Sequence, residues 1–383
     1  MALLRPLCIP GLITSIRAEP VRRQSWIINT HLPALNCSAE ASLPAKQRMS
    51  TVKDQQVIWS KILDTYQKAQ DSGSASKYKT STQILTDQHS HIKFVLRVSD
   101  SLRDKPKPPK SSEEQKAWRD PFAPYDEALW VDHLSPTHTL LLNKFNVVAY
   151  HVLVVTKEFK HQTDVLDLQD LEATWQVVQA IPQGALAYFN CGPESGASQP
   201  HKHIQVVPLP LADDPAVIPS PLSQMIDRAW QDSQLHAGAI ASVHDLPYQN
   251  YFSKLSSRTQ PNQLISIYKS LLQKCSTGGQ PPGSYNLLLT REHMVLVPRR
   301  KEYIGSVAIN ALGFAGTILV NSKAGLEYIQ DQGPIKILEA AGLPQPAVRA
   351  IGLKRLEHIN HLYAGNFAAC PGSCTFQLKG RIF

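Results

Sequence analysis

One stretch of the chain constrains the fold more than any other, because it places two short apolar runs on either side of a loop. Ala185–Asn190 and His201–Val207 have the composition of strands, and Pro208 ends the second. The residues between them, Cys191–Pro200, are rich in glycine, serine and proline, which is typical of a loop. The stretch therefore predicts two strands of a sheet with a loop between them.

Strand and helix patterns alternate along the rest of the chain, which predicts an α+β, mixed α/β fold. Asp167 begins a helix whose first turn carries Asp170. Helices are predicted over Gln55–Gln70, Asp167–Ile181, Met225–Leu235, Pro261–Cys275, Ala324–Gln332 and Ile335–Ala341, and strands over Ile92–Val98, within Leu140–Thr156, and over Tyr285–Thr290 and Met294–Pro298, the last two as a hairpin.

The first 48 residues differ from the body of the chain. They hold six lysines and arginines against two glutamates, which is half of the formal net charge of +8. This composition predicts a transit-peptide-like segment, or else a non-native extension if Met49 is the initiator. The six cysteines are scattered, which favours a reducing compartment. We expect a cytoplasmic protein, or a mitochondrial or plastid one if residues 1–48 act as a transit peptide.

Several classes of partner and site are disfavoured by composition. Residues 49–383 carry no clustered basic stripe or aromatic platform, so we expect no nucleic-acid partner. No apolar run reaches the roughly 20 residues of a spanning helix, and Ile304–Val320 is expected to be buried core instead. The tail has His358, His361, Cys370 and Cys374, but their spacing is not that of a zinc knuckle, so we expect no metal ligands.

The second strand carries the candidate chemistry. Side chains alternate along a strand, so we expect His201, His203 and Gln205 to share one face, with apolar neighbours on the other. Loop glycines and serines supply donors for an anion. A neutral His203 can attack phosphorus with one ring nitrogen while the other holds a hydrogen bond, and Gln205 can donate an uncharged hydrogen bond to a phosphoryl oxygen.

A His-x-His pair alone is weak evidence, since the chain has 14 histidines. His89 and His91 form such a pair without a glycine loop or an apolar strand beside them. The context of the loop, the strand and Gln205 distinguishes His201 and His203 from that pair.

The run Ser195–Gln205 resembles the ATP adenylyltransferases, also called diadenosine tetraphosphate phosphorylases. They belong to the branch of the histidine-triad superfamily in which glutamine replaces the third histidine. Three further stretches are similar and occur in the same order: Leu142–Val148, Leu153–Asp164 and Tyr285–Arg299. The resemblance spans Gln55 to Pro346 and does not include the tail.

The resemblance implies an antiparallel histidine-triad-like sheet with flanking helices, and a C-terminal extension that completes the site. It implies a catalytic domain over residues 49–221 and an adenylyltransferase domain over 222–347. Residues 348–383 are left as a tail of unknown structure. The implied enzyme splits a dinucleoside polyphosphate with phosphate, reversibly, into ATP and ADP through an adenylyl-histidine, and can use sulfate. We expect Mg²⁺ to arrive with the nucleotide, no tightly bound cofactor, and a monomer.

The resemblance also assigns roles to single residues. His203 is the expected nucleophile, with Gln205 and His201 beside it. The expected substrate contacts are Asn143, Lys144, Asn190, Ser195, Gly196, Ala197 and Ser198, and from the C-terminal part Ser284, Asn286 and Arg291.

Simpler roles stay open for some of these residues. Lys144 has an alternative role as a surface lysine, and Asn190 as a cap of the loop. Lys77 and Lys79 are equally consistent with solvated loop residues and with phosphate ligands. Cys191 reads as a packing residue. Two other functions also stay open. One is a histidine-triad hydrolase, although Gln205 argues against it, because the resemblance to hydrolytic members would require a histidine at this position. The other is a nucleotide sensor without turnover.

Overall fold

The structure is a computed structural model that describes residues 52–77, 80–88, 90–99, 118–212, 221–233, 235–256, 258–276 and 278–345. These residues belong to one compact unit. The predicted N-terminal segment 1–48, the tail 348–383 with its histidines and cysteines, and His89 and Lys79 lie outside the described residues, as does the side chain of Lys77.

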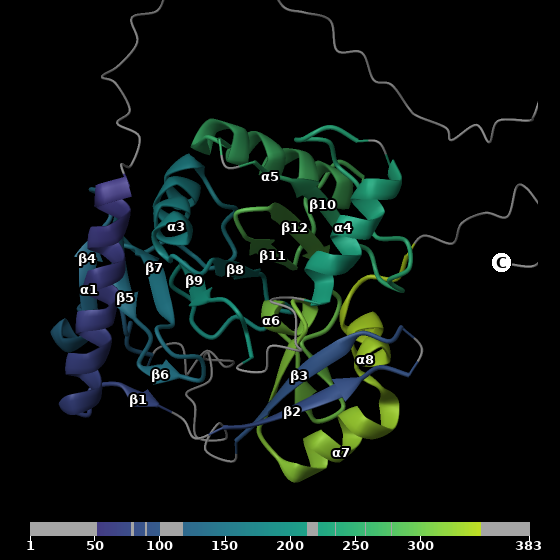
Figure 1. The fold of residues 1–383 in the computed structure, drawn as a ribbon, viewed down its shortest axis with the longest axis horizontal. Helices are drawn as coiled ribbons and strands as arrows, with labels where there is room; N and C mark the ends of the chain where they lie inside the picture. The colour runs from purple at the N-terminus through teal and green to yellow at the C-terminus, as the bar shows by residue number, and fades with distance from the viewer. Residues whose placement is uncertain are drawn as a thin grey trace, which may run out of the picture. The chain divides into compact units, whose positions relative to one another are not determined.

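The centre of the fold is an eight-stranded sheet whose neighbouring strands are all antiparallel (Figure 1). This confirms the predicted antiparallel sheet in a mixed α/β fold. The strand order is β10-β12-β11-β8-β9-β7-β5-β4, formed by β4 (Trp130–His133), β5 (His138–Leu142), β7 (Val152–Thr156), β8 (Ala185–Cys191), β9 (His203–Pro208), β10 (Tyr251–Lys254), β11 (Tyr285–Leu289) and β12 (His293–Pro298).

The pairing of β8 with β11 joins the two stretches of sequence on either side of residue 221. Asn190 in β8 lies opposite Asn286 in β11, and the predicted hairpin of β11 and β12 continues the sheet. Strands from both sides of the predicted domain boundary at 221/222 therefore share one sheet. Their side chains can meet at the end of β8, where the loop Cys191–Pro200 begins.

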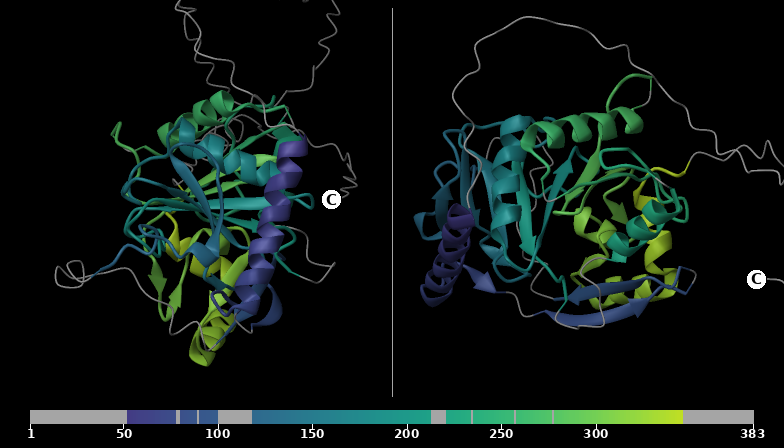
Figure 2. Two further views of the ribbon diagram at one scale, coloured as in Figure 1. Left: turned by 90° about the vertical axis from the view of Figure 1, so that its left-hand side faces the viewer. Right: turned by 45° about the horizontal axis from the view of Figure 1, so that its top comes forward.

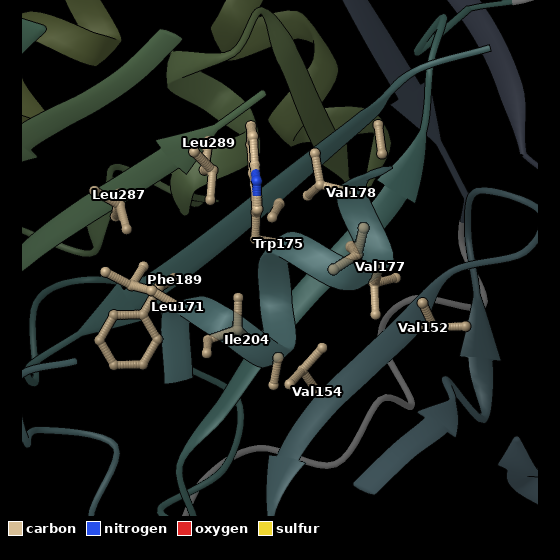
Figure 3. Packing of buried hydrophobic residues seen from close by; sticks show 14 of the residues in the cluster. Val152, Val154, Leu171, Trp175, Val177, Val178, Phe189, Ile204, Leu287 and Leu289 are labelled. Carbon is tan, nitrogen blue, oxygen red and sulfur yellow. The ribbon is translucent and has the colours of Figure 1, made fainter. Parts of the chain in front are cut away.

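Three helices pack against one face of the sheet: α1 (Val52–Asp71), α3 (Leu168–Ala180) and α5 (Pro261–Cys275) (Figures 1 and 2). The predicted start of α3 is confirmed, because Asp167 and Asp170 form a reciprocal capping box. Figure 3 shows Leu171 and Trp175 of α3 among strand side chains that include Ile204 and Leu289. The apolar face of β9 therefore packs in this core.

On the other face of the sheet, a smaller sheet and four helices pack over β8, β10, β11 and β12. β15 (Thr317–Val320) pairs in parallel with β3 (Lys93–Val98), which pairs with β2 (Ser81–Thr86), so the chain's early and late segments meet here. Ile309, Phe314 and Ile318 are buried, which confirms that Ile304–Val320 contributes to the core. The helices are α4 (Pro221–Ser233), α6 (Ala311–Phe314), α7 (Lys323–Gln332) and α8 (Pro334–Ala341).

Short elements complete the architecture. They are β1 (Ser76–Lys77) with β6 (Phe145–Asn146), β13 (Tyr303–Ile304) with β14 (Val307–Ala308), and the 3₁₀ helix η2 (Glu127–Leu129). Among the described residues, none of the helices has the length and apolar character that crossing a membrane would require.

Candidate active site

A cavity of about 400 Å³ lies over the strands β5, β7 and β9. Five residues predicted for the site line it: His203, Gln205, Asn143, Lys144 and Ser198. The structure thus brings together residues from β9, from the turn after β5 and from the loop before β9. The other lining residues are Pro121, Phe122, Pro124, Tyr125, Asp126, Leu129, Leu141, Leu142, Phe145, Leu153 and Gln199.

The alternation along β9 places the polar pair on the cavity side. His203 and Gln205 line the cavity, while Ile204 and Val206 belong to the core under α3. One expectation needs correction, because β9 begins at His203, two residues later than predicted. His201 precedes the strand and is fully buried, with Nδ1 2.7 Å from Asp120 Oδ2 and Nε2 2.8 Å from the carbonyl oxygen of Thr156. His201 therefore does not line the cavity, and its contacts with Asp120 and Thr156 hold the chain in place next to His203.

The backbone fixes the proton position on His203. Its Nδ1 lies 2.9 Å from the carbonyl oxygen of His201. A carbonyl oxygen can only accept a hydrogen bond, so Nδ1 is the donor and the neutral ring has its lone pair on Nε2. This is the arrangement expected of a nucleophilic imidazole.

Gln162 ties the two central strands together beneath the site. Its Oε1 accepts from the His203 backbone N–H at 2.8 Å, and its Nε2 donates to the carbonyl oxygens of Asn190 and His203 at 2.9 and 3.2 Å. Sequence reasoning included Gln162 in a resembling stretch but assigned it no role. A buried glutamine bonded to backbone groups has no periodic signal, so only the fold shows what it holds.

The segment Trp118–Tyr125 was missed altogether. The ring of Phe122 has its centre 5.4 Å from that of His203 and 5.7 Å from that of His201, and Trp118 Nε1 donates to Gln199 Oε1 at 3.0 Å. This segment is rich in proline and aromatic residues and has neither a helical nor a strand period. The run of aromatic and proline residues beside Asp120 was the one feature of the sequence that could have pointed to this segment.

The predicted phosphate loop is fixed by hydrogen bonds within the loop and by close contact with the C-terminal part of the chain. Ser195 is fully buried, and its Oγ donates to the carbonyl oxygen of Gly192 at 2.6 Å. Gly192 and Gly196 have φ of 88° and 79°, a left-handed conformation that glycine favours. A Cβ on Gly196 would lie 2.8 Å from the carbonyl oxygen of Ile309. Of the four residues predicted to cradle phosphate, only Ser198 lines the cavity; Ser195, Gly196 and Ala197 do not.

The C-terminal part fastens this loop. Asn286 Nδ2 donates to Asn190 Oδ1 at 2.8 Å and to the carbonyl oxygen of Ser195 at 3.0 Å, and Ser284 Oγ accepts from the Glu194 backbone N–H at 3.1 Å. None of Asn190, Ser284 and Asn286 lines the cavity. The structure thus uses these predicted substrate contacts to hold the loop, which for Asn190 agrees with the alternative role as a loop cap.

Arg299, the residue after β12, also holds the loop. Its Nη1 donates to the carbonyl oxygen of Ser195 at 3.3 Å and to Asn286 Oδ1, and its Nη2 to the carbonyl oxygen of Ile309 at 2.8 Å. Burial lowers the pKa of the Arg299 guanidinium to about 10. Arg299 lies in a resembling stretch but was given no role by sequence reasoning.

Arg291 lies at the end of α3, outside the cavity. It donates to the carbonyl oxygens of Val178, Gln179 and Ile181 at 3.2, 2.8 and 2.6 Å, so it caps the C-terminus of α3 and is not part of the cavity lining.

Two further residues keep the roles given to them above. Cys191 is buried, and burial raises the pKa of its thiol to about 11, which suits a packing residue. Lys144 is exposed at the cavity and offers a cation there.

The described part of the chain contains no group of three or more histidine, cysteine, aspartate or glutamate residues arranged to hold a metal ion.

Two family models match the chain over most of its described length. Residues 47–228 match the Ap4A phosphorylase N-terminal domain, where Ap4A is diadenosine tetraphosphate, and residues 244–344 match the ATP adenylyltransferase C-terminal domain. The chain is 30% identical over 315 residues to diadenosine 5',5'''-P1,P4-tetraphosphate phosphorylase 2 of Saccharomyces cerevisiae, an alignment that covers 75% of this chain and 95% of the relative.

Solved structures agree with these matches. The crystal structure of a yeast Ap4A phosphorylase in complex with AMP superposes with a TM-score of 0.64 at 27% identity, covering 77% of this chain and 99% of that one. The complex of the yeast enzyme with Ap4A gives a TM-score of 0.63 at 28% identity, covering 76% and 98%.

Proposed function

The chain belongs to the family of Ap4A phosphorylases, and from this membership and the geometry of the cavity we propose that it splits Ap4A with phosphate into ATP and ADP. The observation that carries the proposal is His203, which lines the cavity with its Nδ1 proton committed to a backbone carbonyl and its lone pair on Nε2.

The reaction proceeds in two displacements at one phosphorus atom. The lone pair of His203 Nε2 forms a bond to the α-phosphorus of Ap4A, and the bond from that phosphorus to the bridging oxygen breaks to release ATP. An oxygen of phosphate then attacks the adenylyl group, the bond to Nε2 breaks, and ADP leaves. The ring becomes positively charged while the adenylyl group is attached, and the Nδ1–H bond to the carbonyl oxygen of His201 stabilises that charge.

The other lining residues divide between polar and apolar roles. Gln205 donates to a phosphoryl oxygen without adding charge, and Lys144 offsets the charge of the polyphosphate. Phe122, Tyr125 and Leu153 give part of the cavity an apolar wall suited to a nucleobase.

We further propose that Mg²⁺ accompanies the nucleotide, that the reaction runs in reverse from ATP and ADP, and that sulfate can replace phosphate as acceptor. The enzyme is proposed to act as a monomer, which sedimentation of the purified chain tests. We propose a cytoplasmic location; the two buried free thiols, Cys191 and Cys275, support a reducing compartment. Comparing the cellular location of the full chain with that of a chain starting at Met49 tests whether residues 1–48 direct it elsewhere.

Product analysis tests the proposed reaction. The protein is incubated with Ap4A and Mg²⁺, with and without phosphate, and the nucleotides are separated by chromatography. ATP and ADP formed only with phosphate support phosphorolysis. ATP and AMP, or two ADP, formed without phosphate would show a hydrolase, and unchanged Ap4A that stays bound would show a sensor. The exposed His244 supplies the control, because His244→Ala keeps the rate that His203→Ala abolishes.

A further inference from the structure

We propose that His151 and Tyr188 are positioning residues that fix the direction of the Gln205 amide in the cavity. They do so through a chain of hydrogen bonds that starts at the backbone of the turn after β5. The inference rests on the proposed function, since it explains how Gln205 comes to present a donor to a phosphoryl oxygen.

The first link is the amide of Asn143. The backbone N–H of Phe145 donates to Asn143 Oδ1 at 3.3 Å, and Asn143 Nδ2 donates to the carbonyl oxygen of Phe145 at 3.2 Å. Turning the amide over would set donor against donor and acceptor against acceptor. The backbone therefore decides which end of this amide is nitrogen.

The second link is the tautomer of His151. Asn143 Nδ2 lies 2.8 Å from His151 Nδ1, and because the amide nitrogen can only donate, Nδ1 must accept. A neutral imidazole that accepts at Nδ1 carries its proton on Nε2. His151 is 5% exposed, so bulk water has little access to alter this assignment.

The third link is the hydroxyl of Tyr188. Its oxygen lies 3.4 Å from His151 Nε2 and 2.9 Å from Gln205 Oε1. The hydroxyl accepts from the histidine and has one hydrogen, which it donates to Gln205 Oε1. Tyr188 is 2% exposed, and burial raises the pKa of its phenol, so the hydroxyl keeps this hydrogen at neutral pH.

The last link is Gln205 itself. Tyr188 in β8 and Gln205 in β9 are direct cross-strand partners, which holds the two side chains on the same face. Because Gln205 Oε1 accepts from the Tyr188 hydroxyl, the Nε2 amino group is the part of the amide that faces the cavity. Within the described residues Nε2 has no protein acceptor. The opposite orientation would present oxygen lone pairs to anionic phosphoryl oxygens, which repel them.

The test removes one hydroxyl. Tyr188→Phe frees the Gln205 amide to turn over, so we expect kcat for Ap4A phosphorolysis to fall about tenfold with KM within about twofold, less than the loss of a whole oxyanion donor. In a Gln205→Ala background the same change has no amide to orient and alters kcat less than about twofold. Tyr248→Phe is the matched control, because Tyr248 is equally buried in the same apolar cluster.

His151 gives a second test that depends on chemistry rather than on folding alone. His151→Gln keeps a terminal amide that can donate to the Tyr188 hydroxyl, whereas His151→Leu keeps none. The proposal expects the glutamine variant to retain several times the kcat of the leucine variant when both have matching Tm values. Equal kcat for the two variants would overturn the role given to His151.

Two kinetic results would overturn the proposal as a whole. One is a wild-type kcat for Tyr188→Phe, and the other is an equal loss in the Gln205→Ala background. A readout without turnover separates this from failure of the proposed reaction: Tyr188→Phe should shift the side-chain amide NMR signal of Gln205, identified by its absence in Gln205→Ala. A wild type that forms no ATP and ADP refutes the reaction, whereas an unmoved amide signal refutes the positioning.

Discussion

Replacing Gly192 with alanine should destabilise the protein by about 2–5 kcal/mol, of which the left-handed backbone accounts for about 1–2 and overpacking for about 1–3. Gly192 has φ +88°, and a Cβ there would lie 2.1 Å from the carbonyl oxygen of Gly283 and 2.8 Å from Ser284 Cα. Both atoms belong to the backbone, so relief requires the loop and the C-terminal part to move apart. The measurement is the free energy of unfolding from urea titration.

Gly238 provides a matched control for this prediction. It has the same φ of +88°, but a Cβ there would meet nothing within 4 Å. Gly238→Ala therefore carries the backbone strain and the change in unfolded-chain entropy without the collision. The difference between the two variants isolates the collision, at about 1–3 kcal/mol. We also expect kcat to fall only in Gly192→Ala. Equal destabilisation of the two variants would refute the close approach of loop and C-terminal part.

Three further changes test other parts of the structure. His203→Ala should abolish turnover while isothermal titration still detects nucleotide binding, and near-normal turnover would refute its role as nucleophile. Arg291→Ala should cost about 1–3 kcal/mol of stability by leaving carbonyls at the end of α3 without donors, with KM unchanged, whereas a raised KM would show a substrate contact. Burial lowers the pKa of His293 to about 4 from an ordinary 6.5. The stability contributed by the neutral ring is therefore complete above pH 6.5, and about 3 kcal/mol is lost as the pH falls to 4. Urea titrations over this pH range should show the loss in the wild type and not in His293→Asn.

The elements with strong local signals were predictable from the sequence. The helix α5 spans the predicted Pro261–Cys275, and α3 begins at the predicted cap Asp167, because the apolar period and the cap act within one element. The start of β9 was predicted two residues early, at His201. His201 has strand-like neighbours, but its ring is held by Asp120 and Thr156, which are distant in sequence.

The candidate site was predictable where chemistry lies in one motif. His203 and Gln205 follow from the alternation of a single strand, and Asn143, Lys144 and Ser198 from the resembling stretches. The roles of Phe122 and Gln162 do not follow from such patterns, because each acts through contacts with residues that are tens of positions away. Local patterns contain no record of such contacts.

The C-terminal part completes the site without lining the cavity, and this explains why residues predicted to bind substrate there are engaged elsewhere. Asn286 and Arg299 bond to the carbonyl oxygen of Ser195, and Ser284 bonds to the backbone of Glu194, so three side chains from one hairpin hold successive points of the loop. The same loop continues through Ser198, which lines the cavity, to Pro200, shortly before β9 begins at His203. The strands from β7 to β12 are continuous in one sheet, so the hairpin of β11 and β12 and the strand that carries His203 are held in one framework. Within it the amide of Asn286 fixes the loop backbone through its hydrogen bond to the carbonyl oxygen of Ser195.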